Sequence, residues 1–349
     1  MLIKKRNSKN SLDKKFRLSE YLAEYIIKSV SFVTFAGVIL IFLFVFREAS
    51  PIFFPKEKAA VSVDNLQQET YGEEPSQNSA PQKENYKSFT SNEETDVASL
   101  KNLSGKDWQP IGEKPKYGLL PLFIGSFKAT MIAILIGAPI AILAAIFSAL
   151  FAPKYLREII KPSIELLASF PSVVVGFFAL ITLATLFQNI FGYTYRLNAF
   201  IGGLAMALAV IPIVFTVTED ALTAIPKSFT EASLALGANK WQTAFFVVLP
   251  AATPGVFAAL LLGFGRAFGE TMIVLMATGN APLSSLNIFE PVRTLSATIG
   301  AEMAEVVFGD THYTVLFLIG ALLFIITFCI NAVAEFYVRA KLMKRFRGE

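Results

Sequence analysis

The sequence predicts an all-α membrane protein with six transmembrane helices and a long extracytoplasmic loop after the first helix. Hydrophobic residues make up 54% of the 349 positions and charged residues 17%, which is far more apolar than a soluble domain. Several apolar runs reach the length of about 20 residues that a helix needs to cross a bilayer. Lysine and arginine gather in alternate connections between these runs, as they do on the cytoplasmic side of membrane proteins.

The N-terminal part of the chain predicts one membrane anchor followed by a polar loop. Residues 1–28 form a basic cytoplasmic tail, and residues 29–46 are almost wholly apolar and form the first transmembrane helix. A cleaved signal peptide is the alternative, but the basic region is long and no A-x-A-like site precedes Pro51. Residues 47–116 are rich in Glu, Gln, Asn, Ser and Lys, so we expect a partly disordered extracytoplasmic loop.

A core over residues 117–340 is expected to contain the other five helices, and residues 341–349 form a second basic tail. The charge bias places both tails in the cytoplasm. The predicted spans are residues 130–151, 164–187, 199–217, 251–278 and 315–338.

The outer side is predicted to carry an amphipathic helix over residues 291–308, because apolar residues recur there every three or four positions. This helix either packs at the mouth of a channel or lies at the membrane interface. His312 follows it and is expected to be an ordinary solvated residue. With one histidine and one cysteine, Cys329, the chain offers no metal site of these residues.

The connection over residues 219–250 predicts a short helix, a glycine turn and a second helix. Ser228 and Glu231 have the spacing of a capping box, and Asn239 repeats the pattern with Gln242. Gly237 lies between them, where it can take the left-handed conformation that ends a helix. The second helix is expected to end before Pro250.

The first of these short helices is unusually apolar for a cytoplasmic loop, through Ala232, Leu234, Ala235 and Leu236. Either the protein's own bundle covers it or it fits a groove on a partner protein.

This connection resembles a known family. Glu231, Ala232, Ser233, Gly237 and then Val247, Leu249 and Pro250 are similar, in every spacing, to the EAA---G---------I-LP loop of ABC importer permeases. Ser233 replaces the second alanine and Val247 the isoleucine. The resemblance implies a coupling helix over residues 230–240 that docks on a separate ATPase subunit. The candidate coupling residues are Ser228, Glu231, Ala232, Ser233, Leu234, Leu236, Gly237, Asn239, Leu249 and Pro250.

The chain contains no GxxxxGKS or GxxxxGKT phosphate-binding loop. We therefore expect it to bind no cofactor, and ATP to be used by the partner subunit.

Two charges fall inside the fifth predicted span. Arg266 and Glu270 are four residues apart, which places them on one face of a helix. Each would cost about 2.5–3.5 kcal/mol at the bilayer centre, so we expect them to face the bundle interior or a water path. They form either a structural ion pair or an anion gate, in which a guanidinium exchanges between the carboxylate and the cargo.

The stretch Gly265–Thr271 resembles the G-R-A-x-G-E-T stretch of phosphate-specific permeases, which implies a transport role for Arg266 and Glu270. Thr271 completes this stretch and joins them as a candidate pathway residue. The segments at residues 108–110, 170–174, 295–299 and 301–302 resemble the PstC type within that group.

The resemblance implies a permease subunit of an ATP-driven phosphate importer in the bacterial inner membrane, working by alternating access and not as an enzyme. It implies a PstA-type permease, a dimer of PstB-type ATPase subunits and a PstS-type binding protein as partners, contact with lipid, and no nucleic acid. The Arg and Glu pair leaves sulfate or molybdate open as cargo. An ion-coupled secondary transporter is the alternative from another class.

Overall fold

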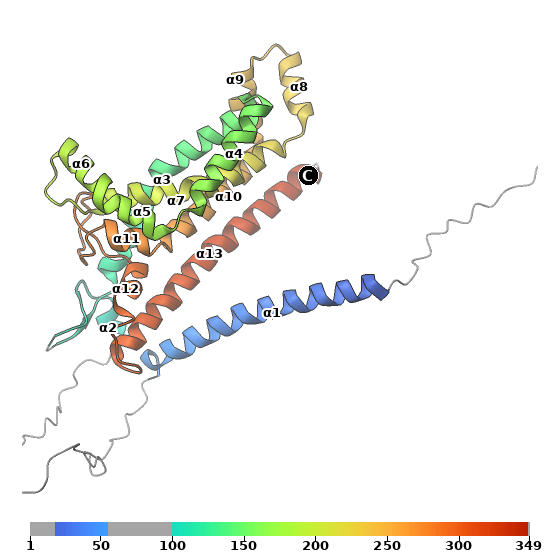
Figure 1. The fold of residues 1–349 in the computed structure, drawn as a ribbon. Coiled ribbons are helices and arrows are strands. Elements are labelled where there is room, and N and C mark those ends of the chain that lie inside the picture. The colour runs from blue at the N-terminus through green and yellow to red at the C-terminus, as the bar shows by residue number, and fades with distance from the viewer. Residues whose placement is uncertain (1–17, 55–99, 113, 348–349) are drawn as a thin grey trace, which may run out of the picture.

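The computed structural model describes residues 18–54, 100–112 and 114–347, and long helices account for most of them (Figure 1). The expected tail residues 1–17 and 348–349 and most of the expected polar loop, residues 55–99, lie outside the described residues. Six of the described helices are long and apolar enough to cross a membrane. They are built from α1 (Leu18–Ala49), α3 (Leu120–Ile146), α5 (Ser172–Phe178) with α6 (Ala184–Phe191), α7 (Ala199–Thr223), α10 (Leu249–Phe268) and α13 (Thr311–Arg347).

Helix α7 lies at the centre of the bundle, packed against α3 on one side and α10 on another. Small residues allow the close approach of α3 and α7: a Cβ on Gly203 would lie 2.5 Å from Ile132, and one on Gly137 would lie 3.1 Å from the carbonyl oxygen of Ala207. The largest fully buried side chain, Phe215, belongs to α7. The core of the membrane domain is therefore built around this helix.

Helix α13 packs on α10 and connects the bundle to α1. Phe42 of α1 lies against Phe324, and Phe44 against Phe317, with ring centroids 5.1 and 5.8 Å apart. Figure 1 shows that α1 lies beside the beginning of α13 and diverges from it toward its own N-terminal end.

Three spanning helices contain a wide π-helical turn: η3 (Phe147–Phe151) after α3, η4 (Ala179–Leu183) between α5 and α6, and η5 (Ala244–Val248) before α10. Such a turn holds one residue more than an α-helical turn does.

The shorter elements gather at the two ends of the bundle. Helices α8 (Lys227–Ala235) and α9 (Lys240–Thr243) lie together at one end, and α2 (Leu100–Leu103) and α12 (Leu295–Glu302) lie at the other (Figure 1). Near α2, strands β1 (Trp108–Gln109) and β2 (Lys116–Tyr117) pair antiparallel with Trp108 opposite Tyr117. The remaining elements are η1 (Ser50–Ile52), α4 (Lys154–Ser169) and α11 (Met272–Ala277).

The boundaries of the third span were predicted wrongly. Residues 164–169 belong to the amphipathic helix α4, and the spanning helix begins at Ser172. Phe170 and Pro171 separate the two with extended backbone, ψ 129° and 133°. The reason is local, since a residue that precedes proline is driven out of the helical region.

The fifth span also differs from the prediction. It is continuous from Lys240 to Phe268 rather than over residues 251–278. Gly269 ends α10, and the chain then turns into the short helix α11. The hydroxyl of Ser296 in α12 donates to the backbone oxygen of Glu270 at 2.6 Å. This bond gives a partner to a carbonyl group that lies beyond the end of α10 and has no helical hydrogen bond.

Candidate functional site

The connection between α7 and α10 forms an elbow of two short helices. Helix α8 begins at Lys227, two residues earlier than a cap at Ser228 predicts, because Pro226 has an extended backbone (ψ 136°) and stands at the N-cap. Ser228 therefore lies inside the first turn, and the capping box predicted for Ser228 and Glu231 does not form. Proline explains the shift, because its fixed φ suits the start of a helix and it has no N–H to donate.

The second half of the elbow follows the prediction. Gly237 has φ +86°, the left-handed conformation that ends α8. The Asn239 side chain accepts from the backbone of Gln242 at 2.8 Å, and the Gln242 side chain accepts from the backbone of Asn239 at 2.9 Å, so this capping box is confirmed.

The second short helix does not end before Pro250 as predicted. It continues through η5 into α10, where Leu249 is half-buried and Pro250 is exposed. The wide turn of η5 ends at Val248, two residues before Pro250, and accommodates a proline that cannot continue regular helical hydrogen bonding. The elbow is thus continuous with a spanning helix.

The elbow exposes apolar side chains at the end of the bundle. Leu236 is 89% exposed and Leu234 is also exposed, together with Phe229, Trp241 and Phe246. Ser233 differs, because it is buried and its hydroxyl lies 3.0 Å from that of Thr243. Of the candidate coupling residues, Ser233 is buried and holds the two short helices together, and Leu249 is half-buried. The others are exposed: Ser228, Glu231, Ala232, Leu234, Leu236, Gly237, Asn239 and Pro250.

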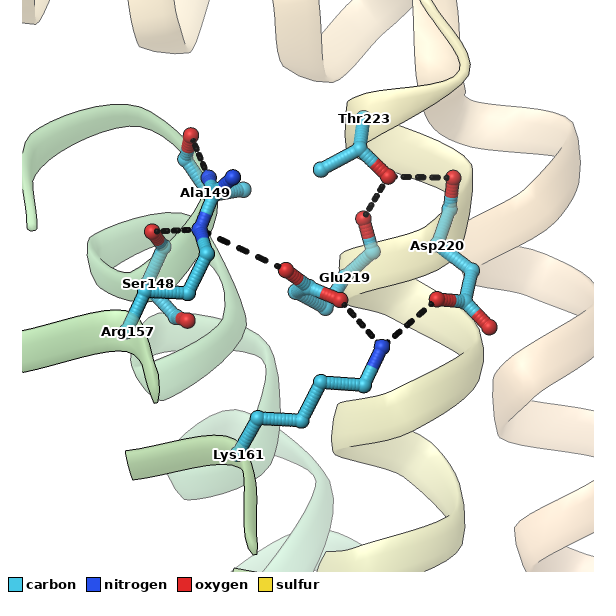
Figure 2. Close-up of polar contacts among 7 residues, drawn as sticks. All are labelled: Ser148, Ala149, Arg157, Lys161, Glu219, Asp220 and Thr223. Carbon is cyan, nitrogen blue, oxygen red and sulfur yellow. Dashed lines mark hydrogen bonds and ion pairs between the residues drawn. The ribbon is translucent and has the colours of Figure 1, made fainter. Parts of the chain in front are cut away.

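An ionic cluster ties α4 to the end of α7, directly before this elbow (Figure 2). It consists of Arg157, Lys161, Glu219 and Asp220. Lys161 Nζ lies 2.9 Å from Glu219 Oε2 and 3.0 Å from Asp220 Oδ1, and Arg157 Nε lies 3.7 Å from Glu219 Oε1. The hydrogen bonds from Lys161 to Glu219 and then to Asp220 raise the pKa of Lys161 above its usual value, against the effect of burial. The lysine therefore carries its charge throughout the physiological range.

Arg157 also reaches the end of the preceding spanning helix. Its guanidinium donates to the carbonyl oxygens of Ser148, at 3.0 Å, and Ala149 (Figure 2). A cation is favourable there, because the carboxyl end of a helix is electronegative and leaves carbonyl groups without partners. This cluster was not predicted from the sequence. Two features of the sequence could have indicated it. Arg157 and Lys161 are four residues apart and so share a helix face, and two carboxylates, Glu219 and Asp220, stand at the end of an apolar run.

The candidate pathway residues lie where α10 ends. Arg266 is in the last turn of α10 and exposed, whereas Glu270 is beyond the end of the helix and half-buried. The predicted common helix face is therefore wrong, because the helix stops at Gly269. Within the described residues, no ion pair joins Arg266 to Glu270. Thr271 lines a hollow of about 280 Å³ with Gly269, Ser296, Gly300 and Thr327, between α10, α12 and α13.

At the opposite end of the molecule, Glu302 is the centre of a second polar group. Its Oε1 lies 2.5 Å from Arg293 Nη1 and 3.2 Å from Trp108 Nε1, and its Oε2 lies 2.9 Å from His312 Nε2. His312 is 8% exposed, so the prediction of a solvated histidine was wrong. Its position at the start of α13, against Trp108 and Tyr117, buries it.

One further cation holds the loop before α12. Lys128 of α3 is buried and donates to the backbone oxygens of Ser285 and Asn287, each at 2.8 Å. The prediction began the second span at residue 130, whereas α3 begins at Leu120. Lys128 thereby fell outside the predicted helix.

Comparison with known proteins places the elbow and the bundle in a family. The family described as "Binding-protein-dependent transport system inner membrane component" matches residues 137–341, more than half of the chain. The chain belongs to this family. It is therefore a multi-pass transport subunit of the inner membrane and not an enzyme, and the predicted all-α permease fold is confirmed.

Two relatives of this inner membrane component are similar to it over about two thirds of its length. The "Probable ABC transporter permease protein YqgH" of Bacillus subtilis is 34% identical over 232 residues, 66% of this chain and 75% of the relative. The "Phosphate transport system permease protein PstC" of Mesorhizobium japonicum is 32% identical over 253 residues, 67% of this chain and 76% of the relative.

Proposed function

We propose that this chain is the permease subunit through which an ATP-driven importer moves inorganic phosphate across the inner membrane. The elbow is the observation that carries the ATP-driven part, because its exposed apolar residues are joined without a break to the spanning helix α10. A partner that binds Leu236 and its neighbours can therefore move a helix of the pathway. The phosphate transport permeases among the relatives support phosphate as the cargo.

The partners follow from the same proposal. A dimer of PstB-type ATPase subunits binds the elbow and uses ATP, a PstA-type permease completes the pathway, and a PstS-type binding protein delivers phosphate at the opposite end. This chain itself binds no cofactor. Both of its termini lie in the cytoplasm, on the side of the elbow, as the basic residues of the tails favour.

Arg266, Glu270 and Thr271 serve the pathway in this proposal. The guanidinium of Arg266 offers a fork of donors that fits phosphate oxygens, and its exposure on this chain leaves it accessible to cargo between two permeases. Because Glu270 follows a helix end, the distance between the two side chains changes when α11 turns relative to α10. Exchange of Arg266 between Glu270 and phosphate then needs no unwinding of a helix.

The first experiment tests cargo and energy source together. Vesicles containing this chain with its co-purified subunits and binding protein should accumulate phosphate only when ATP is present inside them, and should not accumulate sulfate or molybdate. Uptake of either other oxyanion at the rate of phosphate would reject the cargo. Uptake by the purified chain alone, driven by an ion gradient, would reject the ATP-driven class in favour of a secondary transporter.

The second experiment tests the elbow. Leu236→Asp should abolish co-purification of the ATPase subunit, because a charge replaces an apolar side chain that the proposal buries on docking. Ile111→Asp is the matched control, since Ile111 is 75% exposed but lies at the other end of the molecule. Normal co-purification of Leu236→Asp would contradict docking at this surface.

The third experiment tests the pathway residues. Arg266→Gln should lose phosphate uptake in an assembled complex, and Arg266→Lys should keep part of it, because lysine retains the charge but not the fork. Full uptake with Arg266→Gln would show that the arginine is dispensable.

A further inference from the structure

The ionic cluster joins three elements, not two. Arg157 belongs to α4, pairs with Glu219 at the end of α7 and binds the backbone of Ser148 and Ala149 in the last turn after α3. Lys161, one turn further along α4, binds Glu219 as well. Glu219 therefore binds two cations of α4, and one of these, Arg157, also binds the end of α3 (Figure 2).

The two carboxylates of the cluster differ in burial. The Glu219 side chain is 4% exposed, whereas that of Asp220 is 62% exposed. A carboxylate at the depth of Glu219 is strongly disfavoured unless cations and hydrogen bonds compensate it, so its two partners are held firmly. An exposed pair such as Lys161 and Asp220 contributes little, because water and salt screen it.

The connection from the cluster to the elbow is short. Ala224, Ile225 and Pro226 alone separate α7 from α8, and the first two are hydrogen-bonded back to Asp220 and Leu222. A displacement of α8 is therefore carried directly to the end of α7.

A path from α8 straight to α4 is less direct. Arg157 lines a hollow of about 370 Å³ together with Thr230 and Glu231 of α8, so empty space rather than packed side chains lies between them. The end of α3 contacts the elbow itself, since the ring centroids of Phe151 and Trp241 lie 4.5 Å apart. Between α4 and the end of α7, the ion pairs are those of Glu219 and Asp220, and Glu219 is the buried carboxylate.

We propose that Glu219 is a positioning residue for transport, which makes α4 move with the end of α7 when α8 is displaced. This inference rests on the proposed function of the chain. When the ion pairs of Glu219 are lost, α4 follows the movement of α7 less closely. ATP hydrolysis then continues while less phosphate crosses the membrane for each ATP used.

The test measures ATP hydrolysis and phosphate uptake in the same vesicles containing the complete transporter. Glu219→Gln keeps the size of the side chain and removes its charge, so the ratio of phosphate moved to ATP used should fall several-fold while the subunits still assemble. Asp220→Asn is the matched control in the same cluster and should keep the original ratio. Lys161→Met should lower the ratio like Glu219→Gln, and Lys161→Arg should restore it.

A second measurement needs no cargo. Spin labels at Tyr155→Cys on α4 and Lys227→Cys at the start of α8, in a Cys329→Ala background, report the distance between these helices in the assembled complex. Both positions are exposed. In the otherwise unchanged chain the distance should be the same with and without ATP, because the two helices move together. With Glu219→Gln it should change when ATP binds.

The inference would be overturned if Glu219→Gln left the ratio of phosphate moved to ATP used unchanged, or if Asp220→Asn lowered that ratio equally. It would also be overturned if neither Glu219→Gln nor Lys161→Met assembled with the other subunits, because the cluster would then serve folding alone. A reference complex that hydrolyses ATP without importing phosphate would instead contradict the proposed function. The distance measurement would still test the role of Glu219 in that case.

Discussion

Replacing Glu302 by Gln should destabilise the end of the protein opposite the elbow. Three side chains from separate segments meet on this carboxylate: Trp108 of β1, Arg293 before α12 and His312 at the start of α13. The Glu302, Arg293 and His312 side chains are 12%, 15% and 11% exposed. Gln keeps one acceptor oxygen but removes the charge that compensates Arg293.

The expected magnitude follows from this burial. Removing one partner of a buried ion pair costs about 3–5 kcal/mol, because the other charge is left uncompensated. Gln retains part of the hydrogen bonding, so we expect about 3 kcal/mol. At about 2–4 °C for each kcal/mol in a domain of this size class, the midpoint of thermal unfolding should fall by roughly 6–12 °C.

The effect should depend on pH. Burial opposes ionisation of Glu302, but the hydrogen bond from His312, the charge of Arg293 and the bond from Trp108 outweigh it and hold the pKa of Glu302 below its usual value. A carboxyl whose pKa is lower in the folded state stabilises the fold above its unfolded pKa, and this contribution is lost as pH falls through the folded pKa. The difference between the original chain and Glu302→Gln should therefore be full at neutral pH, begin to shrink near the unfolded pKa of about 4.3, and vanish only below the lowered folded pKa.

Thermal unfolding of the purified protein, followed by intrinsic tryptophan fluorescence, measures this difference because Trp108 belongs to the group. Glu305→Gln is the matched control, since Glu305 lies three residues away and is exposed. Equal unfolding midpoints for the two variants at neutral pH would refute the argument that Glu302 compensates buried charge.

Three more variants test particular contacts. Gly237→Ala should destabilise the folded protein by about 1–2 kcal/mol, because a residue with a Cβ is disfavoured at φ +86° even though no atom lies within 4 Å of the new Cβ. The midpoint of thermal unfolding should fall, and an unchanged midpoint would contradict this. Gly125→Ala should lower the yield of folded protein, because the new Cβ would overlap the carbonyl of Arg293, while Gly37→Ala meets no atom within 4 Å and serves as control. Lys128→Met should speed protease cleavage of the loop over residues 279–294, which loses two hydrogen bonds; equal cleavage rates would show that the loop does not depend on Lys128.

The fold class was predictable because its signals are local. Apolar runs and the charge bias indicated six spanning helices, and the spacing of Asn239 and Gln242 indicated a cap that the structure confirms. The errors occurred where another element decides the outcome. Pro226 displaced the expected cap at Ser228, and Gly269 together with Ser296 of α12 ended the helix that was expected to carry Glu270.

The ionic groups were harder to predict because their members are far apart in sequence. Arg157 and Glu219 lie on different helices, and their pairing depends on how α4 packs on α7. His312 was expected in solvent because its neighbours in sequence are polar. The strand pair that brings Trp108 and Tyr117 against it has no signature near His312 itself.

The π-helical turns have a consequence for insertions and deletions along this chain. Deleting one residue inside Phe147–Phe151, Ala179–Leu183 or Ala244–Val248 would convert the wide turn into a regular α-helical one. The helix on either side would keep its facing residues, whereas a deletion elsewhere in a span would rotate everything beyond it by about 100°. Single-residue length differences among sequences of this architecture should therefore be tolerated at these three turns and rejected in the regular helix around them.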